Sequence, residues 1–485
     1  MFLVLLLRAG LPVLVSPTCL NDGSDFVQQA AMTAFSKAVT IAFAVTAKTR
    51  TNVSQRRGRQ HNVPPPPRIG ATPGPQLSSS NENTDAVDLT DLCSIMNVTS
   101  PHDLLALLVD PVTGIRGVHA NRPVDTGHVL LKVLLSSCLM DSKPPKWLQP
   151  EHDGITNLQH PSQWAIRLAA CVLDLPPGRY KDLLPDAAQF RATLPIHWAE
   201  DVLVSAQCAA LELAVDSAYF ARAQAVADLM DGLVLLASSD EVDMDDDGVV
   251  RKLKQQCDYA LDIVQTRTCR LMEPTAALVG HGGHPVRVLA PIFDFINHAG
   301  TAANACFQQE GDYLVVRAKK DIGLGTEVFI DYGESAKPSW KCLFSYGFLG
   351  GQKTDDSVAE AYLDGVRYEV GPSKIPYELV EAEDQFMKQN GLMTGNTNAD
   401  ELTLTPLIAL SLAKRLSDIA FQLVLHQPCS KGNDDNTEED PENVIAEQLA
   451  ASLRWCHHRT LLDCAIGLRD WAAGGESPDL TGISP

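Results

Sequence analysis

Three short motifs near the middle of the chain, in a fixed order, constrain its fold more than any other feature. Residues 291–298 read Pro-Ile-Phe-Asp-Phe-Ile-Asn-His, residues 329–333 read Phe-Ile-Asp-Tyr-Gly, and residues 346–348 read Tyr-Gly-Phe. The first motif ends an apolar run, which predicts that Asn297 and His298 follow a buried segment at a loop, where polar groups can meet a ligand. Each motif alone is common and indicates only turns or packing, whereas the ordered set is specific.

The residues between the first two motifs predict two short strands joined by a turn. Residues 315–318 and 328–330 are rich in β-branched and apolar residues, which favour strands. Residues 321–325 contain two glycines and predict the turn. Tyr332 then follows a strand end, where its hydroxyl can face a pocket as a donor, an acceptor or, if its pKa falls, a base.

A second group of motifs lies upstream. Residues 114–120 read Gly-Ile-Arg-Gly-Val-His-Ala, and an apolar stretch at residues 128–133 follows a turn at residues 123–127. Gly114 and Gly117 allow the backbone to approach a ligand closely. Taken alone this pattern indicates only a β-turn.

Together, the upstream and central motifs resemble those of SET-domain protein methyltransferases, in the branch typified by the Rubisco large-subunit lysine methyltransferase. The resemblance implies an α+β fold with small, pseudoknot-like SET β-sheets, a helical insertion and a mostly α C-terminal domain. It implies S-adenosyl-L-methionine as the cofactor. It also implies an enzyme that transfers a methyl group to a protein side-chain nitrogen, with lysine as the expected acceptor and histidine as an alternative.

The resemblance assigns a role to each site residue. The catalytic residue would be Tyr332, which would orient the attacking nitrogen. The cofactor would be bound by Gly114, Arg116, Gly117, Arg267, Asn297, His298 and Phe348. The target side chain would be bound by Asp294, Tyr346, Cys269 and Phe293. Asp294 could equally be a structural hydrogen-bond acceptor.

Two positions depart from the family's pattern. Ile115 stands where the family often has the first glycine of Gly-x-Gly, and Cys269 stands where lysine-modifying relatives commonly have an aromatic residue. A small thiol would leave a wider slot for the target side chain, unless Phe293 refills it. The departures keep open a non-catalytic SET scaffold that binds proteins. A remoter alternative is a metal-dependent hydrolase built on His281, His284, Asp294 and His298.

Helical patterns fill the rest of the folded chain. Between the two groups of motifs, residues 164–173, 199–236 and 251–271 have helical spacing or composition. After residue 360 the pattern is helical again, at residues 377–389, 405–427 and 442–471. The predicted domains are a leader and linker at 1–86, a SET domain at 87–349 with its insertion at about 150–285, and a substrate-binding domain at 350–485.

The composition narrows the class of partner. The net charge is −21, and no basic stripe appears in the folded region, which argues against direct nucleic-acid binding. The twelve cysteines include no Cys-x-x-Cys pair, so no zinc ribbon is predicted. We expect a monomer that acts on a protein substrate and binds no membrane.

The N-terminal residues resemble a targeting leader. Residues 2–7 are apolar but too short and broken to predict a transmembrane helix. Residues 26–81 contain basic but no acidic residues, which is typical of transit peptides for plastids or mitochondria. The alternative is a disordered tail on a cytoplasmic protein.

Overall fold

The computed structural model divides the chain into residues 1–72 and 73–485, and every residue that it describes lies in the second unit. The described residues are 98–99, 104–109, 115–148, 163–237, 247–272, 285–333, 338–350, 358–372, 374–392, 404–425, 441–475 and 480–481. The described residues do not include the predicted leader, Gly114, His281 or His284, so the roles assigned to them stay predictions.

The largest sheet joins the two groups of motifs. Its order is β1 (Val98–Thr99), β4 (Val129–Leu134), β10 (Tyr313–Ala318) and β9 (Ala305–Glu310), with every neighbouring pair antiparallel. Leu130, Leu131 and Val133 of β4 and Leu314, Val315 and Val316 of β10 are buried, so consecutive side chains on both faces of this sheet are covered. Strand β10 confirms the strand predicted at residues 315–318.

A separate hairpin holds the upstream motif. Strand β3 (Arg116–Ala120) pairs with β2 (Leu105–Val109), which the sequence did not predict, and not with β4. The hairpin contacts the residues before β11 (Phe329–Ile330), because the Val328 N–H donates to the Val118 carbonyl at 2.7 Å. The upstream motif therefore lies beside the second central motif.

Two predictions about local structure were wrong. Asn297 and His298 form strand β8 (Asn297–His298), parallel to β11, and not a loop. The helix predicted to run to residue 271 ends at Arg267, and strand β6 (Cys269–Met272) follows it. This strand belongs to a sheet of order β5-β7-β6, with β5 (Leu139–Met140) and β7 (Pro285–Leu289). In both cases pairing with a distant strand overrides the local pattern.

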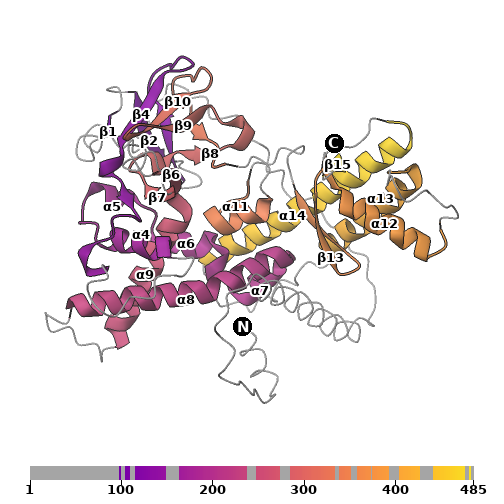
Figure 1. Ribbon diagram of the computed structural model, residues 1–485, viewed down its shortest axis with the longest axis horizontal. Helices are drawn as coiled ribbons and strands as arrows, with labels where there is room; N and C mark the ends of the chain where they lie inside the picture. The colour runs from indigo at the N-terminus through magenta and orange to yellow at the C-terminus, as the bar shows by residue number, and fades with distance from the viewer. Residues whose placement is uncertain are drawn as a thin grey trace, which may run out of the picture. The chain divides into compact units, whose positions relative to one another are not determined.

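Among the described residues, six α-helices follow the first group of strands in the sequence and precede the second (Figure 1). They are α4 (Gln163–Leu173), α5 (Arg179–Leu183), α6 (Ala187–Thr193), α7 (Glu200–Ser205), α8 (Ala209–Ala237) and α9 (Asp247–Arg267). The helix predicted over residues 199–236 is broken between α7 and α8, where Gln207 has a φ of 51°. One buried core combines residues of α4, α8 and α9 with residues of the sheets.

The C-terminal part is mostly helical, as predicted. Helix α11 (Ser339–Tyr346) precedes this part. The C-terminal part contains α12 (Tyr377–Gln389), α13 (Pro406–Leu425) and α14 (Pro441–Ala472). Helices α13 and α14 pack along each other (Figure 1). A hairpin of β12 (Ala359–Leu363) and β13 (Val366–Val370), and the short pair β14 (Ile375–Pro376) and β15 (Leu480–Thr481), were not predicted. The predicted α+β class is confirmed.

Within the described part of the chain, no helix has the length and apolar character needed to span a membrane.

Candidate active site

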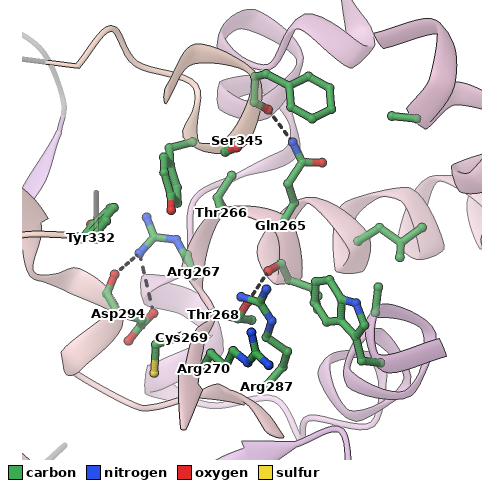
Figure 2. A pocket seen from close by; sticks show the side chains of 18 of the residues that line it. Gln265, Thr266, Arg267, Thr268, Cys269, Arg270, Arg287, Asp294, Tyr332 and Ser345 are labelled. Atoms are coloured by element: carbon green, nitrogen blue, oxygen red, sulfur yellow. Dashed lines mark hydrogen bonds and ion pairs between the residues drawn. The ribbon is translucent and has the colours of Figure 1, made fainter. Parts of the chain in front are cut away.

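A cavity of about 680 Å³ opens between the sheets and the inserted helices. Its lining comes from α4, α8 and α9, from β6 and β7, and from the segments that carry the central motifs. Figure 2 shows its polar side chains converging from these elements. Six of the predicted site residues line it: Arg267, Cys269, Phe293, Asp294, Tyr332 and Tyr346.

A strained turn precedes the acidic residue of the cavity. Ile292 has a φ of 70°, which is unfavourable for a β-branched side chain and persists only where the surroundings hold it. The short 3₁₀ helix η4 (Phe293–Phe295) begins directly afterwards and carries Phe293 and Asp294, which both line the cavity.

The Asp294 carboxylate is buried, and few interactions offset the free-energy cost of its burial. Its side chain is 0% exposed, and neither of its oxygens accepts a hydrogen bond within the described part of the chain. Arg267 Nη1 donates to the Asp294 backbone carbonyl at 2.8 Å but lies 3.6 Å from Oδ2, which is too long for a hydrogen bond. Burial raises the pKa of Asp294 to about 6, although Arg267 and the nearby Tyr180 hydroxyl oppose the shift. Asp294 is therefore no ordinary structural acceptor.

Tyr332 is held by two hydrogen bonds. Its hydroxyl donates to the Ile296 carbonyl at 2.7 Å, and its backbone N–H donates to His298 Nδ1 at 3.0 Å. Burial raises the pKa of Tyr332 well above its usual value. The hydroxyl is therefore protonated at neutral pH and can orient a reactant, whereas the role of base that the sequence left open is unsupported.

Three aromatic rings surround this tyrosine. The Tyr332 ring centroid lies 5.1 Å from that of His298, 5.0 Å from Tyr346 and 6.3 Å from Phe348. Tyr346 and Phe348 stack at 5.7 Å. Such pairs stabilise fixed ring orientations, so the position of the hydroxyl is rigidly set.

Asn297 connects the upstream hairpin to the central motifs. Its Nδ2 donates to the Arg116 carbonyl at 2.8 Å and to Glu327 Oε1 at 2.7 Å. A Cβ at Gly117 would lie 2.3 Å from the same Glu327 oxygen, so only glycine leaves room for this arrangement. The structure thus brings Arg116, Gly117 and Asn297 together. It adds Glu327, which sequence reasoning missed although it stands directly before the strand of the second motif.

Residues 116–333 match the family model of the SET domain. The chain contains a SET domain. No protein in the curated set is significantly similar to this sequence.

Solved structures of LSMT resemble the chain at low identity. "Crystal structure of the SET domain of LSMT bound to Lysine and AdoHcy" has 13% identity and a TM-score of 0.48, with 79% of this chain and 90% of that chain covered. "Structure of Rubisco LSMT bound to AdoMet" has 13% identity and a TM-score of 0.46, with 79% and 91% covered.

The other predicted site residues that the structure describes lie outside the cavity lining. Arg116, Gly117, Asn297, His298 and Phe348 do not line the cavity. Tyr332 lines it and also contacts His298 and Phe348, so this residue joins the two groups. Arg116 reaches another element, because its guanidinium donates to the Leu183 carbonyl of α5.

Sequence reasoning also missed part of the cavity wall of the SET domain. Phe307 of β9 packs edge-to-face on Phe293, with ring centroids 5.0 Å apart. Trp164, Arg222, Arg270 and Arg287 complete the wall. Helical spacing had marked Trp164 only as a core residue. No sequence signal places the three arginines in one cavity, because they come from different elements.

Across the described ranges, no group of three or more His, Cys, Asp or Glu residues is placed to hold a metal ion. His457 and Cys464 on α14 are buried core residues.

Proposed function

We propose that this protein is an S-adenosylmethionine-dependent protein methyltransferase that modifies a side-chain nitrogen, with lysine as the first candidate. The observation that carries the proposal is the position of Tyr332, whose buried hydroxyl faces the Ile296 carbonyl where the cavity meets the Asn297–His298 strand. The SET-domain match over residues 116–333 supports the reaction class.

The residues of the upstream hairpin and of β8 suit the cofactor. When bound, S-adenosylmethionine supplies an electrophilic methyl group on a sulfonium. Gly117 leaves room for the Glu327 carboxylate beside the hairpin, and Asn297 holds the hairpin to β8 through the Arg116 carbonyl. Arg267 Nε has no hydrogen-bond partner among the described residues, and a guanidinium with spare donors suits a ligand carboxylate.

The cavity side suits the methyl acceptor. A protonated lysine cannot attack, and burial in a cavity with apolar walls lowers the pKa of an amine. The Tyr332 hydroxyl donates its hydrogen bond to the Ile296 carbonyl, so its oxygen lone pairs are left to accept a hydrogen bond from the attacking nitrogen. Such catalysis consists mainly of positioning and electrostatic stabilisation.

Asp294 adds a pH-dependent contribution to this site. With a pKa of about 6, its carboxylate is mostly neutral in mild acid and charged at neutral pH. A charged carboxylate attracts an incoming ammonium group, so the proposed activity should rise as the pH passes through 6. Histidine remains the second candidate acceptor, because Cys269 at the cavity wall leaves room for a ring.

Calorimetry with the full chain tests the proposal. We expect wild-type protein to bind S-adenosylmethionine in the micromolar range and Asn297→Ala to lose this binding. Absence of binding by folded wild-type protein would leave a SET scaffold that serves protein interaction. Metal analysis of the same sample would address the remoter hydrolase alternative.

The N-terminal leader remains a separate proposal. Its support is the stretch at residues 26–81, which lacks acidic residues. A fusion of residues 1–86 to a fluorescent protein should localise to a plastid or a mitochondrion. Diffuse cytoplasmic fluorescence would contradict import.

A further inference from the structure

Two arginines of the cavity wall are neighbours on adjacent strands of one sheet. Arg270 of β6 and Arg287 of β7 are directly opposite in the antiparallel register. Both line the cavity, and Figure 2 shows their side chains beside each other. Like charges at directly opposite positions destabilise a strand pair, so this arrangement opposes local stability.

No described carboxylate forms an ion pair with either arginine. Asp141 accepts a hydrogen bond from the Arg287 backbone N–H at 3.1 Å, and that contact does not involve the guanidinium. The Arg287 guanidinium instead lies 4.8 Å from the Trp164 ring centroid, a cation–π contact that orients it without adding an ion partner. Arg270 is exposed.

A third arginine of the same cavity shows the opposite behaviour. Arg222 of α8 contacts Asp258 at 3.0 Å and Asp262 at 2.8 Å, so its charge is balanced. The chain has 60 acidic and only 39 basic residues, and acidic partners are therefore not scarce. In such a chain, two neighbouring arginines without an ion pair are expected where function requires them.

We propose that Arg270 and Arg287 form a subsite for a carboxylate side chain of the protein substrate, close in sequence to the methyl acceptor. The inference rests on the proposed function, because it uses the same cavity. Cys269 and Tyr332 line that cavity too, so one extended substrate segment would reach both groups. Paired guanidinium groups bind a carboxylate through charge-assisted hydrogen bonds. The substrate class is thus a lysine flanked by Asp or Glu.

Fluorescence anisotropy with two labelled peptide pools tests the subsite. Both pools have a central lysine, and the flanking positions are randomised between alanine and glutamate in one pool and between alanine and glutamine in the other. We expect full-length wild-type protein to bind the glutamate pool about tenfold more tightly, with a preference that weakens as salt increases. Equal binding of the two pools would overturn the inference.

Variants assign the preference to the two arginines. The double variant R270Q/R287Q should bind both pools equally. The single variant R270Q changes only an exposed side chain, so it should fold and should reduce the preference even where the double variant does not fold. Arg251→Gln, at an exposed position of α9 outside the cavity lining, is the matched control and should keep the preference. An unchanged preference in R270Q/R287Q would assign the effect to other residues and overturn the inference.

Cofactor calorimetry on the same samples separates the two proposals. Binding of S-adenosylmethionine without a glutamate preference would remove only the subsite. A glutamate preference that R270Q/R287Q abolishes, without cofactor binding, would support the subsite as a peptide-binding site and remove the methyltransferase.

Discussion

Two buried arginine–carboxylate pairs, one in the SET domain and one in the C-terminal helices, are built in contrasting ways. In the C-terminal part, Glu383 of α12 is 1% exposed and accepts from Arg415 Nη1 at 2.8 Å and from the Ser411 hydroxyl. Arg415 Nη2 also donates to Asp364 at 2.8 Å. In the SET domain, the Arg267–Asp294 distance is 3.6 Å, and neither carboxylate oxygen nor Arg267 Nε has a hydrogen-bond partner among the residues described.

The difference separates a structural pair from a site prepared for ligands. A buried charge without hydrogen bonds costs free energy, and folded proteins seldom keep one without a reason. The pair in the C-terminal helices is satisfied and joins α12 to α13. Under the proposed function, the Arg267–Asp294 pair offers its unpaired hydrogen-bonding atoms to the cofactor and the substrate.

The largest expected effect is on methyl transfer. Tyr332→Phe removes the hydroxyl that donates to the Ile296 carbonyl, so we expect the rate to fall by about 10²- to 10³-fold. A melting temperature close to that of the wild type would show that the fold is kept. Tyr313→Phe, outside the cavity, is the control and should retain activity. Full activity of Tyr332→Phe would contradict the role given to this hydroxyl.

Replacing each arginine tests the comparison directly. Arg415→Met leaves Glu383 buried without its ion partner, which should lower the free energy of unfolding by about 3 kcal/mol. Arg267→Met at pH 6 should cost no more than about 1 kcal/mol, because Asp294 already has a raised pKa and can take up a proton. Urea denaturation of both variants measures these values.

Cofactor calorimetry distinguishes the two variants further. We expect Arg267→Met to abolish cofactor binding and Arg415→Met to keep it. Equal losses of stability, with cofactor binding kept in both, would remove the distinction between the two pairs.

The pH dependence of stability should sharpen the comparison. Folding raises the pKa of Asp294 from 3.8 to about 6, so the native state binds more protons than the unfolded state between these values. The contribution of Asp294 to stability is therefore present in full below about pH 4 and is lost as the pH rises through 6. Relative to Asp294→Asn, the wild type should lose on the order of 2 kcal/mol between pH 4 and 7.

Denaturation at a series of pH values tests this expectation, with Asp312→Asn at an exposed turn as the control. A constant difference between wild type and Asp294→Asn across this range would show that the Asp294 pKa is not raised.

The smallest expected effect concerns the upstream hairpin. Gly117→Ala places a Cβ within 2.3 Å of Glu327 Oε1, so Glu327 must move away from Asn297. We expect cofactor affinity to fall about tenfold, equivalent to about 1.4 kcal/mol, in calorimetry. Gly467→Ala in α14, where a Cβ meets no atom within 4 Å, is the matched control. Unchanged affinity in Gly117→Ala would separate the hairpin from the cofactor site.

Local sequence determined the helices of the C-terminal part and the identity of the central motifs. The predicted helix at residues 377–389 matches α12 (Tyr377–Gln389), because an apolar periodicity of 3.6 residues needs no distant partner to be recognised. The SET-domain match over residues 116–333 bears out the reading of the motifs, since they combine glycine turns and strand ends whose residue types follow from backbone geometry.

Only the tertiary structure decided which strands pair and which charges are compensated. Cys269–Met272 became a strand because β7 lies beside it, and the register of that pair set Arg270 opposite Arg287. Glu327 became part of the site because Asn297 and Gly117 meet there. Whether a buried charge is balanced depends on atoms from elements far apart in the chain. The sequence could therefore name Arg267 and Asp294, and only their three-dimensional surroundings showed that their hydrogen bonds are left incomplete.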